Sequence, residues 1–170
     1  MQSLELKTEH LLLYPCTLSV ANSAYGGRLQ TEAAAGVKIS PDWFEFDGRS
    51  LLTYYARWLE QDLTNFTWGL WLIHHVETNL IIGSAGYKGK PNVEGMVEIG
   101  YGIASRFRRQ GYTFEAVTCL VEWAFQNPDV QVITAECLQN NAGSKRILEK
   151  LGMHYLGLQG SYMKWRLPRP

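Results

Sequence analysis

A basic loop that leads into a helix is the first feature of this sequence that could do chemistry. Arg106, Arg108 and Arg109 surround Gly111, after a strand-like run and before an apolar stripe of helical spacing. The first turn of a helix leaves backbone N–H groups without partners, and the helix dipole adds positive potential there. Such a loop can hold a phosphate group. A basic surface turn is the alternative, and the loop chemistry alone does not choose between the two.

The strand before this loop carries a carboxylate beside two glycines. Residues 96–103 alternate, with Glu98, Gly100 and Gly102 on one face and larger apolar residues on the other. Two glycines on one strand face are costly unless something approaches the backbone closely there. The pattern therefore predicts a strand with one open face.

A second polar helix start follows the next predicted strand, residues 130–135. Asn141 is a good N-cap residue. Ser144 lies in the first turn of the helix that follows, on the same face as the apolar stripe that includes Ile147 and Leu148. The spacing therefore predicts a helix whose first turn points a hydroxyl inward.

Apolar periodicity predicts the elements that must position these residues. Strands are expected at residues 6–14, 68–75, 80–87, 96–103, 130–135, 153–158 and 161–167. Helices are expected at 17–35, interrupted at Gly26-Gly27, at 51–63, and after each of the two polar loops. A cluster at Trp43, Phe44 and Phe46 has no clear place in this pattern.

Composition limits the classes of protein. The chain has 170 residues, 46% hydrophobic and 19% charged, which predicts one globular domain over residues 1–170. Its 16 basic residues balance 16 acidic ones, so a wide basic face for nucleic acid is not expected. No apolar run approaches the roughly 18–20 residues of a membrane span, and the first residues lack the pattern of a secretory leader.

The cysteines point to a reducing compartment. Cys16, Cys119 and Cys137 are far apart and odd in number, and no spacing of Cys and His predicts a metal site. We therefore expect a cytoplasmic protein with free thiols, without a metal, and without nucleic-acid or membrane partners.

Two of these segments carry a resemblance to a known family. Residues 108–113, Arg-Arg-Gln-Gly-Tyr-Thr, match the Gln/Arg-x-x-Gly-x-Gly/Ala pyrophosphate signature of the GNAT acyltransferases, except at Thr113. Arg109 also stands where many members carry Gly. Residues 141–153 look like the Asn-x-x-Ser…Glu-Lys-Leu-Gly-Phe segment of the RimJ/RimL-like branch, and residues 6–13 are similar to its first strand. The match is poor over residues 17–79, where such families vary with their substrates.

The resemblance implies a fold and a cofactor. The fold would be α/β (α+β), a mixed and mostly antiparallel sheet of about seven strands with flanking helices. Two neighbouring parallel strands would splay to admit a pantetheine arm. The implied co-substrate is acetyl-CoA, with no metal, and Tyr112 either stacks near its adenine or shields the helix start. By resemblance the cofactor would bind the Ile103 backbone, Arg108, Arg109, Gln110, Gly111, Tyr112, Thr113 and Asn141.

The implied activity is N-acetyl transfer to a primary amine of a small molecule or of a peptide or protein N-terminus. Glu98 would be the base, and Ser144 would hydrogen-bond or protonate the CoA sulfur. A cross-strand ion pair for Glu98 and a capping role for Ser144 are the alternatives. A CoA-binding regulatory module without robust catalysis is the alternative function, and a homodimer is left open. The tryptophans Trp58, Trp68 and Trp71 are expected in the core, unless one lines the acceptor cleft.

Overall fold

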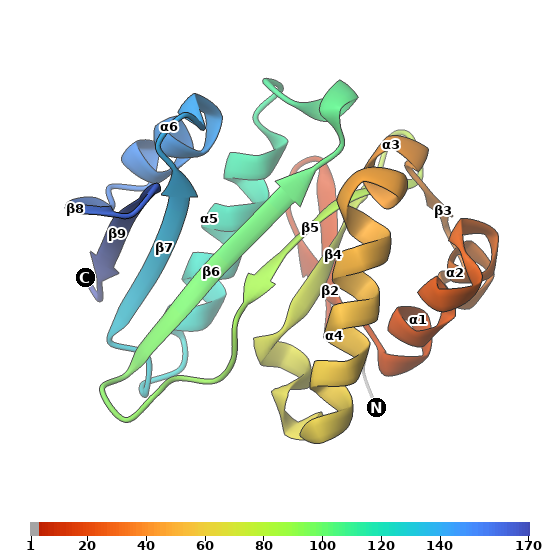
Figure 1. Ribbon diagram of the computed structural model, residues 1–170, viewed down its shortest axis with the longest axis horizontal. Coiled ribbons are helices and arrows are strands. Elements are labelled where there is room, and N and C mark those ends of the chain that lie inside the picture. The colour runs from red at the N-terminus through yellow and green to blue at the C-terminus, as the bar shows by residue number, and fades with distance from the viewer. Residues whose placement is uncertain (1–3) are drawn as a thin grey trace.

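Nine strands form one sheet in the computed structural model, which describes residues 4–170 (Figure 1). The order is β1-β2-β4-β5-β6-β7-β9-β8, and β3 pairs with β5 outside this row. The strands are β1 (Leu6–Lys7), β2 (Leu11–Pro15), β3 (Lys38–Ile39), β4 (Leu70–His75), β5 (Leu80–Tyr87), β6 (Met96–Ile103), β7 (Val132–Leu138), β8 (His154–Gln159) and β9 (Tyr162–Pro168). The pairs β6–β7 and β3–β5 are parallel and the others antiparallel. The expected mixed sheet is confirmed. It has nine strands and not about seven, because it includes the short strands β1 and β3.

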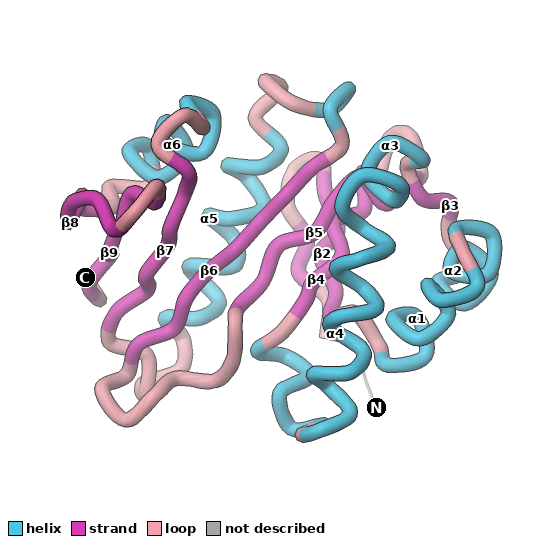
Figure 2. The backbone as a smooth tube through the Cα atoms, viewed as in Figure 1, coloured by secondary structure: helices cyan, strands magenta, loops and turns pink. Residues whose placement is uncertain are grey.

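Helices cover both faces of this sheet (Figures 1 and 2). They are α1 (Leu18–Ser23), α2 (Arg28–Ala35), α3 (Pro41–Trp43), α4 (Arg49–Gln61), α5 (Tyr112–Phe125) and α6 (Ala142–Lys150). Figure 1 shows α4 in front of the sheet and α5 behind it. Contacts agree with this placement, because the Tyr87 hydroxyl at the end of β5 donates to the Leu120 carbonyl of α5 at 2.7 Å, while Lys88, the next residue, lines a cavity under α4. No helix within residues 4–170 is long and apolar enough to cross a membrane.

The aromatic cluster that the sequence pattern leaves unplaced lies in the segment between α2 and α4. Residues Phe44–Gly48 form a π-helical turn between α3 and α4. Trp43 and Phe44 are buried, whereas the Phe46 side chain is 88% exposed. Proline stands at the first position of α3, where its fixed φ suits a helix start.

The expected first strand, residues 6–14, is wrong as a single element. It is two strands, because the chain turns at residues 8–10. The Thr8 hydroxyl accepts a hydrogen bond from the Leu11 N–H at 3.1 Å. The Glu115 carboxylate of α5 accepts hydrogen bonds from the Thr8 hydroxyl at 2.5 Å and the His10 N–H at 2.8 Å. A residue more than 100 positions away therefore stabilises the turn, which no local pattern reveals.

Strands β6 and β7 separate part-way along their length, as expected. They pair from Met96 opposite Val132 to Ile99 opposite Ala135. Beyond that point β6 continues to Ile103 paired only with β5, and β7 continues to Leu138 paired only with β9. The sheet therefore opens between Gly100 and Glu136.

Candidate active site

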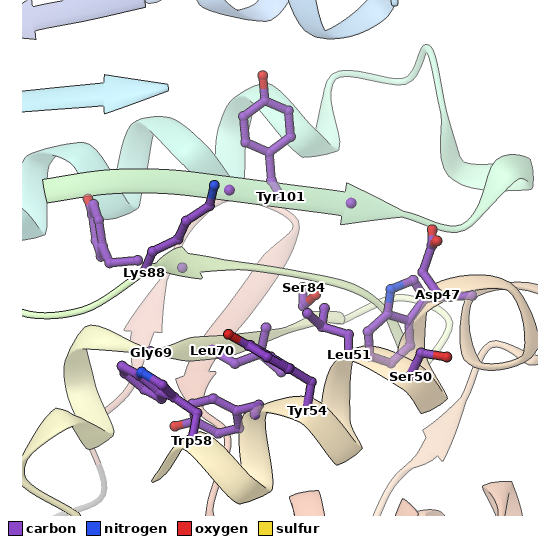
Figure 3. Close-up of a pocket in the computed structure, with 16 residues that line it drawn as sticks. Asp47, Ser50, Leu51, Tyr54, Trp58, Gly69, Leu70, Ser84, Lys88 and Tyr101 are labelled. Carbon is purple, nitrogen blue, oxygen red and sulfur yellow. The ribbon is translucent and has the colours of Figure 1, made fainter. Parts of the chain in front are cut away.

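A cavity of about 810 Å³ lies between α4 and the sheet (Figure 3). Its floor is the paired residues Ser84 opposite Gly102 and Gly86 opposite Gly100. A methyl group built at Gly100 or Gly102 would meet no atom within 4 Å. The glycines that the sequence places on one strand face therefore leave open space in front of β6, and a ligand can approach the backbone there.

Aromatic side chains form the wall opposite this floor. Tyr54 and Trp58 lie one turn apart on α4, and Figure 3 shows both beside the cavity. Trp68 and Trp71 are buried against Trp123 of α5, at centroid distances of 4.9 and 5.1 Å. The expectation of a tryptophan core therefore holds for Trp68 and Trp71, whereas Trp58 lines the cavity. The helical spacing of Leu51, Tyr54, Tyr55 and Trp58 is the sequence signal that places Trp58 on the same face of α4 as the other residues of this wall.

The predicted phosphate loop joins β6 to α5. Gly111 is the N-cap residue of α5 with φ 90°, and Arg109 has φ 62°. Glycine adopts this left-handed region without strain, and the same geometry at Arg109 explains why a glycine suits that position. Within the described chain, the backbone N–H groups of residues 109–113 have no hydrogen-bond acceptor. The loop therefore presents successive free donors at the positive end of a 14-residue helix.

The three arginines near this loop do not act together. Arg106 turns away, with its Nε atom 3.8 Å from Asp42 Oδ1 and an Nη atom 3.4 Å from the Ser40 hydroxyl. The expectation that Arg106 surrounds the phosphate site is therefore wrong, because Asp42 of α3 attracts it. Arg108 donates through Nε to the Ile103 carbonyl at 3.3 Å, so it buttresses the loop from within. Arg109 has no ion pair among the described residues.

The remaining loop residues face different surroundings. Gln110 donates through its side-chain amide to the Arg106 carbonyl at 2.8 Å. The Tyr112 ring packs against His75 at a centroid distance of 4.7 Å and against Phe107 at 6.3 Å. The ring therefore packs on β4 and on the turn before the loop, and both expectations for Tyr112 stay predictions. Thr113 is half-buried in the first turn of α5.

Glu98 lies on the cavity face of β6, within a network of ion pairs that joins β6, β7 and β9 to the residue after β5. Lys88, which directly follows β5, binds the Glu98 carboxylate and also reaches Glu136 of β7, with 3.4 Å between Nζ and Oε1. Lys164 of β9 binds the other Glu136 oxygen. Burial would lower the pKa of Lys88, but the hydrogen bond to Glu98 and both carboxylate charges raise it. The cross-strand ion pair considered for Glu98 is therefore present.

Asn141 and Ser144 start α6 as the sequence predicts. The Asn141 side-chain oxygen accepts a hydrogen bond from the Ser144 N–H at 3.0 Å. The Ser144 side chain is half-buried beside Tyr101, and its hydroxyl takes no part in capping α6. Asn141 is thus the cap, and the Ser144 hydroxyl is not needed for it.

Tyr101 is a residue near the site that sequence reasoning missed. Its ring projects from β6 beyond the point where β6 and β7 separate (Figure 3). Its hydroxyl lies 3.5 Å from the Ser144 carbonyl, and it lines the cavity. Burial raises the pKa of Tyr101 to about 12, so the hydroxyl stays protonated at neutral pH. The alternation of β6 placed it on the core face, and only the separation of the strands exposes it.

Comparison with known proteins identifies the family of this chain. The family model described as acetyltransferase (GNAT) domain matches residues 17–154. The chain belongs to the GNAT acetyltransferase family. This acetyltransferase is 29% identical over 160 residues to the N-acetyltransferase YjdG of Bacillus subtilis, covering 94% of this chain and 95% of that protein.

Solved structures share its fold. The ribosomal-protein-S5-alanine acetyltransferase of Vibrio fischeri superposes with a TM-score of 0.68 at 16% identity, covering 98% of this chain and 97% of that one. RimL, a ribosomal L7/L12 alpha-N-protein acetyltransferase solved in complex with coenzyme A, gives 0.71 at 15% identity, covering 97% and 98%. The RimJ/RimL-like resemblance is confirmed at the level of fold.

The donor of this acetyltransferase is acetyl-CoA, as in its family. The residues present fit that group. The free amides of residues 109–113 suit a pyrophosphate, and the gap between β6 and β7 suits an extended arm. Within the described part of the chain, no three His, Cys, Asp or Glu side chains gather as metal ligands would.

Proposed function

We propose that this acetyltransferase acetylates a primary amine that enters through the cavity under α4, on a small molecule or at a peptide or protein N-terminus. One observation carries the proposal: the cavity and the opening between β6 and β7 meet at Gly100 and Tyr101. A donor held between the strands and an acceptor under α4 would meet there from opposite sides. The named acceptors of the Vibrio fischeri and RimL proteins support the N-terminal version.

The loop after β6 supplies the donor site in this proposal. The backbone amides of residues 109–113 and the guanidinium of Arg109 would hold the pyrophosphate. The Ile103 backbone and the side-chain NH₂ of Asn141 would hold the pantetheine arm. Asn141 can do this while capping α6, because the cap uses only its oxygen.

Glu98 is the proposed base. A lysine-like amine has a pKa of about 10.4 in water, so it must lose a proton before it attacks the thioester. Glu98 lies on the cavity face one residue before β6 and β7 stop pairing, which puts a carboxylate where that proton leaves. Glu98 pairs with Lys88, and a water molecule would link its carboxylate to the amine.

Ser144 is the proposed donor to the departing sulfur. Bound acetyl-CoA supplies an activated carbonyl whose thiolate needs a hydrogen bond or a proton as it leaves. The Ser144 hydroxyl is not used in the cap of α6 and lies in the first turn of that helix, beside Tyr101. We assign the whole chain, residues 1–170, to one catalytic domain of a cytoplasmic enzyme.

The test has two stages. Calorimetry should show that acetyl-CoA binds and that ATP does not. Thiol release should then be measured with primary amines of several classes, including short peptides with free N-termini and matched peptides whose N-termini are already acetylated. Release with free amines alone supports the proposal. Tight acetyl-CoA binding with no release from any amine would instead indicate a regulatory CoA-binding module.

A further inference from the structure

The ammonium group of Lys88 lies in front of the point where β6 and β7 separate. The last pair before the separation is Ile99 opposite Ala135. Glu98 precedes this pair on β6 and Glu136 follows it on β7. Both carboxylates contact Lys88 Nζ, so the two strands fix the place of this amine from either side.

The three side chains share the cavity face of the sheet. Glu98 is opposite Thr134 in the parallel pair, and Glu136 is two residues further along β7, so both carboxylates point the same way. The Lys88 N–H, directly after the end of β5, donates to the Glu98 carbonyl of β6 at 3.0 Å, which places the two residues side by side. Lys88 is the one lysine among the described residues that line the cavity.

Lys88 therefore stands where the proposed reaction needs an acceptor nitrogen. The paired Gly86 and Gly100 have no side chains, so nothing from the floor separates the lysine from the open gap. Its side chain is 55% exposed, so the amine is held by its two carboxylates and not enclosed.

We infer that Lys88 is an internal acceptor, acetylated by the enzyme's own bound acetyl-CoA when no external amine competes. The inference rests on the proposed function. In this step a C–N bond forms between Lys88 Nζ and the acetyl carbon, and the thioester C–S bond breaks. The ammonium loses two protons: one passes to Glu98 and then to water, and the other ends on the CoA thiol. The product is an uncharged amide that no longer pairs with Glu98 or Glu136.

The experiment uses the whole purified protein with isotopically labelled acetyl-CoA and no added amine. Intact mass should rise by one acetyl group per chain, and peptide mapping should place it on Lys88. Lys90 and Lys145 are internal controls, because their side chains are 42% and 48% exposed and neither lines this cavity. Modification of Lys88 should be more than about tenfold faster than theirs, because the donor is held beside it.

Three comparisons sharpen the result. The rate constant should not change with protein concentration, since the step is intramolecular. A saturating external amine that is itself acetylated should suppress it. Lys88→Arg should abolish the main modification while keeping a cation between the carboxylates.

The outcomes separate this inference from the proposed function. An enzyme that acetylates external amines but leaves Lys88 unmodified would overturn the inference alone. Equal rates at Lys88, Lys90 and Lys145 would also overturn it, since they indicate uncatalysed acetylation. Failure to bind acetyl-CoA in calorimetry would reject both.

Discussion

The Asn141 side-chain oxygen lies 3.0 Å from the Ser144 backbone nitrogen, so the cap of α6 is the asparagine and not the serine. This relationship separates the two readings of Ser144 experimentally. Removing a residue that caps a helix lowers the stability of the protein, whereas removing a residue that contacts the leaving group lowers turnover.

Replacing each of these two residues by alanine should therefore give different defects. Asn141→Ala should lower the free energy of unfolding by about 0.5–2 kcal/mol. Ser144→Ala should leave the melting temperature nearly unchanged and lower kcat and kcat/KM together, because its contact exists mainly in the transition state. Thermal melts and thiol-release kinetics on both variants check this. A destabilised Ser144→Ala protein with normal turnover would remove Ser144 from the chemistry.

Gly111→Asp should abolish acetyl-CoA binding, because it places a negative charge at the free amides of the loop. Gly111 has φ 90°, so any side chain there also introduces backbone strain. Gly111→Asn is the matched control, since asparagine has the same shape, no charge and a tolerance for this region. Calorimetry should show binding lost in the aspartate variant and largely kept in the asparagine variant. Equal affinities would exclude the loop from the donor site.

Glu98→Gln should lower the acetyl-transfer rate by about 10²–10⁴-fold without changing acetyl-CoA affinity, because it removes a base and keeps the shape. The deficit should shrink at high pH, where the acceptor amine deprotonates without help. Glu136→Gln is the control, because it removes the other carboxylate that binds Lys88. If both variants lose activity equally at every pH, the ion-pair network matters and Glu98 is not the base.

Gly100→Val should narrow the cavity without unfolding the protein. A side chain at Gly100 points into open space, and a β-branched residue suits a strand. The KM for the acceptor amine should rise while the melting temperature holds. Gly86→Ala is the contrasting variant, because its methyl group would lie 2.0 Å from the Gly69 carbonyl oxygen and should destabilise the fold. Unchanged acceptor kinetics in Gly100→Val would place the acceptor elsewhere.

The ion pair between His10 and Glu115 should make stability depend on pH. The hydrogen bond to Glu115 raises the pKa of His10 above 6.5. Burial would raise the pKa of Glu115, but hydrogen bonds from Thr8 and His10 lower it below 4.5. The Glu115 contribution is lost as pH falls through its lowered pKa, and the His10 contribution is lost as pH rises through its raised pKa.

The pair should therefore stabilise the protein most between the ordinary values of 4.5 and 6.5. Melting temperatures of the wild type and of Glu115→Gln, measured across pH, should differ most in that window. A difference that stays constant with pH would show that the pair contributes nothing beyond the hydrogen bonds to Thr8 and the His10 backbone.

Local patterns predicted the elements well. The bounds of β6 agree with residues 96–103 because strict alternation is a property of neighbouring residues. The cap at Asn141 and the loop glycine at 111 were likewise readable, since both act within one helical turn.

Long-range contacts explain what the patterns missed. Arg106 leaves the phosphate loop because Asp42, distant in sequence, lies beside it. Glu115 stabilises the turn that divides the first strand, and Lys88 pairs with Glu136 across β6. In each case the two residues that interact lie in different helices, strands or loops, so the pattern of one segment cannot predict the contact. Only the folded chain brings them together. The roles of Glu98 and Ser144 stay predictions.

The separation of β6 from β7 also has a mechanical meaning. Among the described residues, β6 and β7 pair at four positions, from Met96–Val132 to Ile99–Ala135, and this short ladder joins β1–β6 to β7–β9 within the sheet. We therefore expect any slight rotation of the larger part of the sheet against the three-stranded part to take place at this short joint. A molecule lodged in the gap would brace one part against the other, so the occupied enzyme should be the stiffer of the two.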